Sequence, residues 1–175
     1  MLSRCILSSI MIAGLGVLPL LAADGPDWDP WRFLLGEWVG EGEGQPGQGI
    51  GKFSFALDLQ GRILVRKNRA DYPATRERPA YSHEDLMVIY QGPSPSSTRA
   101  IYFDNEGHVI QYRVTVSTDG NSVTFLSDPS PSAPRFRLTY TKGKSGGLKI
   151  LFEIAPPGKP DVFSPYIEAT ASRRK

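Results

Sequence analysis

The chain has few of the residue types that build metal and redox sites. Among its 175 residues there are one cysteine, Cys5, and two histidines, His83 and His108. Because Cys5 lies inside an N-terminal segment that we expect to be removed, the remaining chain can form no disulfide, thiolate metal site or cysteine nucleophile. The two histidines lack the spacing that places zinc ligands on one helical face. We therefore expect no metal site.

Motifs for covalent catalysis and phosphate binding are also missing from the sequence. It has no glycine-rich phosphate loop and no Gly-x-Ser-x-Gly turn that would present a nucleophile. A hydrolase needs a nucleophile, a base and an oxyanion hole, and we identify no such set and no catalytic residue. One alternative stays open, a cofactor-free enzyme that uses Asp104 and His108 for general acid and base catalysis across a hairpin.

A large excess of charge of one sign is absent as well. The formal net charge is +2 at pH 7, and the basic residues form only two short runs, at 66–69 and 173–175. Neither run is interleaved with aromatic residues on a recognisable nucleic-acid-binding fold. We expect no nucleic-acid partner.

The first 23 residues have the pattern of a secretory signal. Arg4 is followed by an apolar run over residues 6–21 and by a pair of alanines. A charged start, an apolar centre and small residues before the cleavage site are typical of a signal peptide, and the run is short for a membrane span of about 20 residues. We predict a signal peptide at 1–23, export to the periplasm or beyond the cell, no stable membrane span after cleavage, and one monomeric domain at 24–175. An uncleaved anchor is the alternative.

Alternation of apolar and polar residues dominates the rest of the sequence and predicts β-strands. Asp29 and Pro30 first indicate a short helix that ends near Leu35. The strand after His108 shows the alternation most clearly, with Ile110, Tyr112, Val114 and Val116 on one face and Gln111, Arg113, Thr115 and Ser117 on the other.

About ten such strands follow one another with short turns. This order predicts an all-β fold, a closed antiparallel up-and-down β-barrel with a short N-terminal helix. Closure removes the exposed sheet edges, and eight to ten strands leave room inside for one small ligand. A β-sandwich is the alternative, because strand spacing alone does not separate the two folds.

Three stretches resemble lipocalin-like (calycin) barrels, especially nitrobindin and related exported bacterial proteins. They are Phe-Leu-Leu-Gly-Glu-Trp-Val-Gly-Glu-Gly at 33–42, His-Glu-Asp-Leu-Met-Val-Ile-Tyr at 83–90, and the segment from 102 to 110. In such barrels the tryptophan of the Gly-x-Trp motif packs at the closed end against a basic side chain near the last strand. The resemblance therefore implies that Gly36 and Trp38 close the barrel together with Arg173 or Arg174, through a cation–π contact.

The resemblance also raises haem and nitric oxide as ligands. Nitrobindin binds haem through a histidine on a late strand, but no histidine follows His108 in this sequence. We therefore assign no cofactor, with haem as an alternative. By alternation His108 points inward near one rim, where it either bonds to a turn, contacts a ligand or serves as an axial ligand. We expect His83, Glu84 and Asp85 to be solvated charges at the start of a strand.

Aromatic residues on different strands are the main candidates for an interior lining. They predict either a well-filled core or a pocket for a hydrophobic or amphipathic small molecule, with Arg66, Asn68, ligand or water as partners for the buried phenols. Our principal hypothesis is a barrel that binds or carries such a molecule. The predicted ligand-binding residues are Phe53, Phe55, Arg66, Tyr90, Tyr102, His108, Tyr112 and Tyr140.

Overall fold

The computed structural model describes residues 25–44, 49–92, 94 and 97–174. The signal peptide predicted at 1–23 lies outside these residues. The described elements are two short 3₁₀ helices and ten strands, which are η1 (Asp29–Trp31), β1 (Gly36–Gly44), β2 (Gly49–Asp58), β3 (Ile63–Tyr72), β4 (Tyr81–Gln91), β5 (Thr98–Asp104), β6 (Val109–Val116), β7 (Ser122–Ser127), β8 (Arg135–Lys142), η2 (Lys144–Gly146), β9 (Leu148–Ala155) and β10 (Ser164–Arg173).

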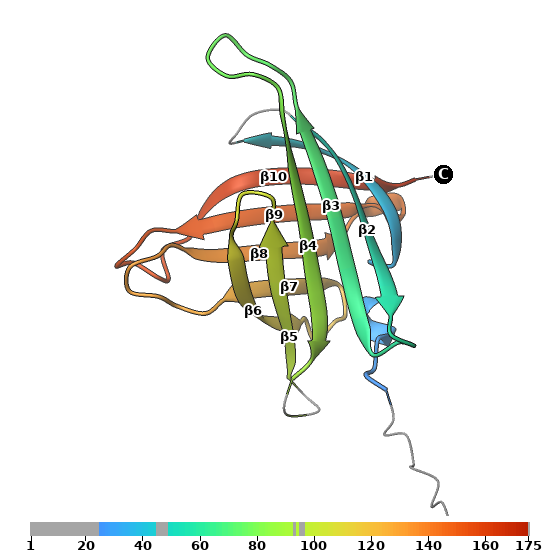
Figure 1. Cartoon of the computed structure of the whole chain (residues 1–175). Helices are drawn as coiled ribbons and strands as arrows, with labels where there is room; N and C mark the ends of the chain where they lie inside the picture. The colour runs from blue at the N-terminus through green and yellow to red at the C-terminus, as the bar shows by residue number, and fades with distance from the viewer. Residues whose placement is uncertain (1–24, 45–48, 93, 95–96, 175) are drawn as a thin grey trace, which may run out of the picture.

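The ten strands form one closed antiparallel barrel (Figure 1). Each strand pairs with its neighbours in sequence, and β1 pairs with β10 over seven positions, from Trp38 opposite Arg173 to Gly44 opposite Ile167. This closure confirms the predicted up-and-down barrel and rules out the sandwich, whose sheets would keep their edges.

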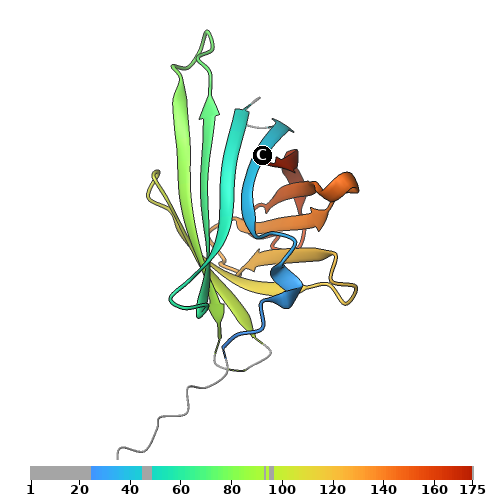
Figure 2. The same ribbon diagram turned by 90° about the vertical axis from the view of Figure 1, so that its right-hand side faces the viewer.

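The predicted N-terminal helix is present but is shorter than expected. It is a single 3₁₀ turn, η1, with Pro30 at its start and no side-chain cap. The turn buries Trp31, and Leu34 follows it into the core. The indole Nε1 of Trp28 donates to the carbonyl of Gly61 at 2.7 Å. This bond holds η1 beside the β2–β3 turn, at the lower end of the barrel in Figures 1 and 2.

The core fills the half of the interior that η1 closes. Alternation places its members on the inner face of each strand, as predicted for Tyr112 and Val114 on β6. The fully buried large side chains are Trp38, Tyr112, Tyr140, Phe55, Phe125, Leu34, Leu64, Met87, Ile89 and Val123. Phe125 lies at the centre of this packing, with its ring 6.0 Å from that of Trp31 and 6.2 Å from those of Tyr112 and Tyr140.

A long hairpin, formed by β3 and β4, extends beyond the opposite end of the barrel. Strands β3 and β4 have ten and eleven residues and extend past the other strands in both views (Figures 1 and 2). Near their tip the rings of Tyr72 and Tyr81 stack, with centroids 4.8 Å apart. The barrel therefore has one packed end and one end that the hairpin overhangs.

Candidate functional site

A cavity of about 760 Å³ occupies the half of the barrel below the long hairpin. Inward positions of the strands supply its wall, and most of these are aromatic or aliphatic. The apolar and aromatic lining residues are Phe53, Ala70, Tyr72, Tyr81, Tyr102, Ile110, Tyr112, Phe136, Leu138, Tyr140, Ile150, Phe152, Ile154, Tyr166, Ile167 and Ala169. The interior is therefore part core and part pocket.

A buried ion pair lies on one wall of this cavity. Arg66 on β3 donates through Nη1 to Asp85 Oδ1 on β4, and both side chains are more than nine-tenths buried. Asn68 donates to the second carboxylate oxygen at 2.8 Å. Burial alone would raise the pKa of Asp85, but the positive charge of Arg66 and the contacts of His83 and Asn68 lower it below its ordinary value. Asp85 is therefore ionised at neutral pH.

His83 joins this pair to the rim of the cavity. Its Nδ1 is 2.9 Å from Glu106 Oε1, and its Nε2 is 3.0 Å from the hydroxyl of Tyr102 and 3.5 Å from Asp85 Oδ2. The contact with Asp85, reinforced by Glu106, outweighs burial and raises the pKa of His83 to about 9. His83 is therefore a cation at neutral pH, and both ring nitrogens carry protons.

The rim is completed by Asp104 and His108 at the β5–β6 turn. Asp104 accepts the backbone N–H of His108 at 2.8 Å and faces its ring Nδ1 at 2.9 Å. Tyr102 donates to the same carboxylate at 3.2 Å. Burial would raise the pKa of Asp104, but the two hydrogen bonds from His108 lower it. This geometry shows His108 bonded to a turn, one of its predicted roles.

Six of the eight predicted ligand-binding residues line the cavity, and two do not. Phe53, Arg66, Tyr102, His108, Tyr112 and Tyr140 are part of the lining. Phe55 is 1% exposed and lies in the packed core beside Tyr140, at a ring distance of 5.4 Å. Tyr90 lies on the outer face of β4, because Met87 and Ile89 take the inward positions.

Arg66 and His108 were predicted at the site and Asn68 was named as a partner for buried phenols, but the inward positions of His83 and Asp85 on β4 were not predicted. The expectation that His83 and Asp85 are solvated is wrong, since Asp85 is 9% exposed and both line the cavity. The pairing of β3 with β4 sets Asn68 opposite Asp85 and Ala70 opposite His83. Alternation of Arg66 with Asn68 was a usable signal for an inward polar row on β3, but it does not reveal which row on β4 faces it.

The closed end is held by the residues of the Gly-x-Trp motif. The Arg173 guanidinium lies over the Trp38 ring at 4.5 Å and donates to the carbonyls of Leu35 at 2.6 Å and Phe33 at 3.4 Å. Gly36 adopts a φ of +114°, and a Cβ there would lie 2.7 Å from Arg173 Nη1. Arg173 rather than Arg174 is thus the closing residue.

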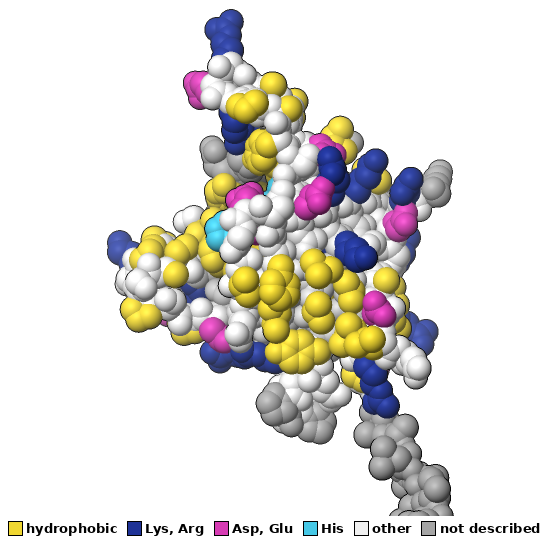
Figure 3. Space-filling view, viewed as in Figure 1, with side chains coloured by type: hydrophobic (Ala, Val, Ile, Leu, Met, Phe, Trp, Pro, Cys, Tyr) yellow, Lys and Arg dark blue, Asp and Glu magenta, His cyan; other side chains and the backbone are white. Residues whose placement is uncertain are grey.

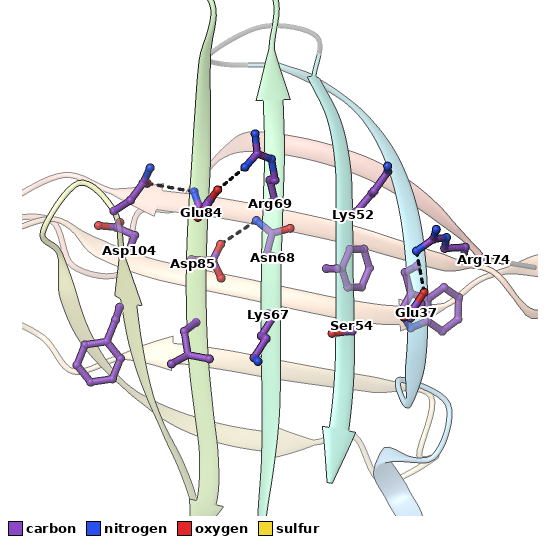
Figure 4. A pocket seen from close by; sticks show the side chains of 15 residues that line it. Glu37, Lys52, Ser54, Lys67, Asn68, Arg69, Glu84, Asp85, Asp104 and Arg174 are labelled. Atoms are coloured by element: carbon purple, nitrogen blue, oxygen red, sulfur yellow. Dashed lines mark hydrogen bonds and ion pairs between the residues drawn. The ribbon is translucent and has the colours of Figure 1, made fainter. Parts of the chain in front are cut away.

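A second hollow, of about 660 Å³, lies on the outer side of β1 to β5 (Figure 4). Its outward side chains are mostly charged, and four of them form two ion pairs. Arg69 contacts Glu84 at 2.5 Å, and Arg174 contacts Glu37 at 3.0 Å. Hydrophobic side chains gather beside it on the outer face of β3 to β5 (Figure 3). This hollow is more open than the interior cavity and has fewer apolar walls, so we take the interior cavity as the candidate site.

Among the described residues there is no group of three or more histidine, cysteine, aspartate or glutamate side chains arranged to hold a metal ion. The helices in the described part of the chain include none long and apolar enough to cross a membrane.

The closed ten-stranded barrel with its aromatic-lined interior defines a calycin-like fold. The chain is similar in structure to the protein in the crystal structure of Rv2717c from M. tuberculosis, with a TM-score of 0.61 and 16% sequence identity. The match covers 85% of this chain and 97% of that one, and at this identity it concerns the fold alone. No family model matches the sequence, and no curated protein matches it.

Proposed function

We propose that the protein binds or carries a small hydrophobic or amphipathic molecule in its barrel. The observation that supports this function is the interior cavity of about 760 Å³, whose walls are mainly apolar and whose polar groups gather on one side, on β3, β4 and the β5–β6 turn. Pockets of about 300–1,000 Å³ with apolar walls and a few placed polar groups are typical of small-molecule sites. The predicted signal peptide makes binding outside the cytoplasm part of the same proposal.

The proposed binding needs no haem. The sequence has only two histidines, and neither lies on a late strand where the resemblance to nitrobindin would place the iron ligand. His83 is unsuitable because its ring nitrogens face Glu106 and Tyr102 and its raised pKa keeps it protonated, without the lone pair that a metal needs. His83 therefore does not fit a haem ligand, whereas the contact of His108 with Asp104 uses Nδ1 alone, so haem at His108 stays the alternative prediction and we derive no role for it.

Binding is also favoured over catalysis at the rim. Asp104 and His108 converge, as a general acid and base would, but Asp104 already accepts hydrogen bonds from two backbone groups of the β5–β6 turn, those of Glu106 and His108. The pair therefore has a structural use that explains its geometry. We propose that it shapes the mouth of the cavity.

Native mass spectrometry of the protein purified without denaturant tests the proposal. We compare wild type with Ala169→Trp, which fills the cavity from β10, and with Thr170→Trp, which adds the same ring at the exposed neighbouring position. A stoichiometric added mass should appear in wild type and Thr170→Trp and be lost from Ala169→Trp. Bare protein in all three samples, or an added mass that survives in Ala169→Trp, would contradict binding in the cavity.

A further inference from the structure

Two polar atoms deep in the cavity have no hydrogen-bond partner within the described part of the chain. They are Arg66 Nε and the hydroxyl oxygen of Tyr140, and both side chains line the cavity. Tyr140 is fully buried and the Arg66 side chain is 9% exposed. Because a buried donor without an acceptor is costly, such groups are uncommon in folded proteins and indicate a site for a partner.

The two unpartnered groups converge from opposite walls of the barrel. Arg66 is on β3 and Tyr140 on β8, which stand five strands apart in either direction around the ten-stranded ring. The guanidinium carbon of Arg66 is 6.0 Å from the Tyr140 ring centre and 5.8 Å from that of Phe53. The Arg66 and Tyr140 side chains therefore lie next to each other in the same part of the cavity.

Both groups are donors at neutral pH. Burial raises the pKa of Tyr140, so its hydroxyl keeps its proton. Burial alone would lower the pKa of Arg66, but the charge of Asp85 together with the neighbouring Tyr140 and Tyr102 outweighs burial, and the net pKa is raised. An sp² oxygen with two lone pairs is an acceptor that satisfies two such donors at once.

The surrounding charges are already balanced. The Arg66 cation is paired with Asp85, and the His83 cation is paired with Glu106. An additional anion would sit close to the ionised Asp85 in a medium of low dielectric constant, where like charges repel strongly. The site therefore favours an uncharged acceptor over a carboxylate or a sulfonate.

We propose that the ligand is a neutral, largely apolar carbonyl compound whose oxygen accepts hydrogen bonds from Arg66 Nε and Tyr140. This inference rests on the proposed function and names the ligand class for the same cavity. The rest of the ligand would lie against Phe136 and Phe152, whose rings are parallel at 5.9 Å, and against the aliphatic side chains Ile150 and Ile154. A flat, apolar or aromatic part of the ligand can pack against these rings.

Three naphthalene probes with the same ring system test the head group. They are 6-propionyl-2-(dimethylamino)naphthalene, which carries a ketone, 2-(dimethylamino)-6-propylnaphthalene, which keeps the three-carbon chain without the acceptor, and 6-(dimethylamino)-2-naphthoic acid, which is an anion at pH 7.5. Fluorescence titration of wild type should give a dissociation constant about tenfold lower for the ketone than for either analogue, as expected for two hydrogen bonds made in a buried site.

Tyr140→Phe then tests the donor, and Tyr90→Phe is the matched control on the outer face of β4. We choose Tyr140 because removing Arg66 would leave Asp85 buried and unpaired. Tyr140→Phe should weaken binding of the ketone probe about fivefold and shift the emission of the bound ketone to the blue. Binding of the probe without the acceptor should not change. The melting temperature of Tyr140→Phe without ligand should change little, since the hydroxyl makes no well-formed hydrogen bond within the described part of the chain and only approaches the Arg66 side chain. Tyr90→Phe should bind all three probes as wild type does.

The possible failures are distinguishable. If wild type binds the ketone and the probe without the acceptor with equal affinity, and Tyr140→Phe has no effect, the inference is overturned and cavity binding stands. This result is expected if water alone accepts hydrogen bonds from the two donors. If the naphthoic acid binds more tightly than the ketone, the inference that the ligand's head group is uncharged is wrong. Absence of saturable binding of all three probes would count against both the inference and the proposed function.

Discussion

At the scale of single residues, Asp85 organises the polar side of the cavity. Its carboxylate is shared by Arg66, by Asn68 at 2.8 Å and by His83 at 3.5 Å. Removing one member of a buried ion pair usually costs more than the pair contributes, because the remaining charge loses its compensation. We infer that the three neighbours hold one another in position, which fixes the donors of Arg66 relative to the cavity.

The raised pKa of His83 links folding stability to pH. The folded pKa of about 9 lies above the ordinary histidine value of 6.5, so protonation of His83 stabilises the folded state. This contribution is fully present below pH 6.5 and is lost as the pH rises through 9. Urea unfolding of wild type should show a loss of about 2 kcal/mol between pH 7 and 9.5 that is absent from His83→Gln.

His108→Gln is the matched control for this pH dependence, since His108 is the other histidine of the chain and lines the same cavity. It should retain the loss of stability seen in wild type. An identical pH profile for wild type and His83→Gln would show that the contacts with Asp85 and Glu106 do not hold the proton on His83.

At the scale of strands, β6 and β4 show when the alternation of apolar and polar residues predicts the inward face and when it does not. On β6 apolar and polar residues alternate strictly, so the inward face was predictable and Tyr112 lines the cavity as expected. On β4 the run Leu86–Tyr90 is apolar on both faces, and alternation alone does not tell which face is buried. The register against β3 makes that choice, and it places Tyr90 outside and Asp85 inside.

The polar cluster was hard to predict for a related reason. An aspartate near the start of a strand is usually solvated, and only a buried arginine on the neighbouring strand reverses this preference. Such a pairing depends on contacts between side chains 19 residues apart in sequence. The closed barrel, in contrast, follows from the repeated strands and short turns, which are local features.

The start of β1 gives a prediction about the glycine of the Gly-x-Trp motif. Gly36 combines a φ of +114° with a Cβ position 2.7 Å from Arg173 Nη1, whereas Gly107 has a φ of +91° and nothing within 4 Å. Gly36→Ala should therefore lower the free energy of unfolding by about 3 kcal/mol, and Gly107→Ala by about 1 kcal/mol, since only the first adds displacement of Arg173 to backbone strain. Chemical denaturation measures both. Equal losses would mean that the approach of Arg173 does not constrain position 36.

At the scale of the whole molecule, the first and last strands meet where the barrel closes. The bond from Arg173 to the carbonyl of Leu35 joins residues 138 apart, and β1 and β10 pair beside it. Closing a loop of this length costs chain entropy that the contacts must offset. The closed end is therefore the place where the fold is completed, and the cavity lies in the other half, where packing is less dense.

The contacts at the closed end predict different effects for substitutions of Arg173 and Arg174, the last two residues that the structure describes. Arg173→Met removes the cation over Trp38 and two hydrogen bonds to backbone carbonyls, and it should cost about 2 kcal/mol of unfolding free energy and shift the tryptophan emission to the red. Arg174→Met removes only an ion pair with Glu37 whose side chains are 59% and 63% exposed, and it should change stability by less than about 0.5 kcal/mol. Urea denaturation followed by tryptophan fluorescence measures both effects. If Arg174→Met proved as costly as Arg173→Met, closure would depend on the general charge of the C-terminal strand and not on the guanidinium stacked over Trp38.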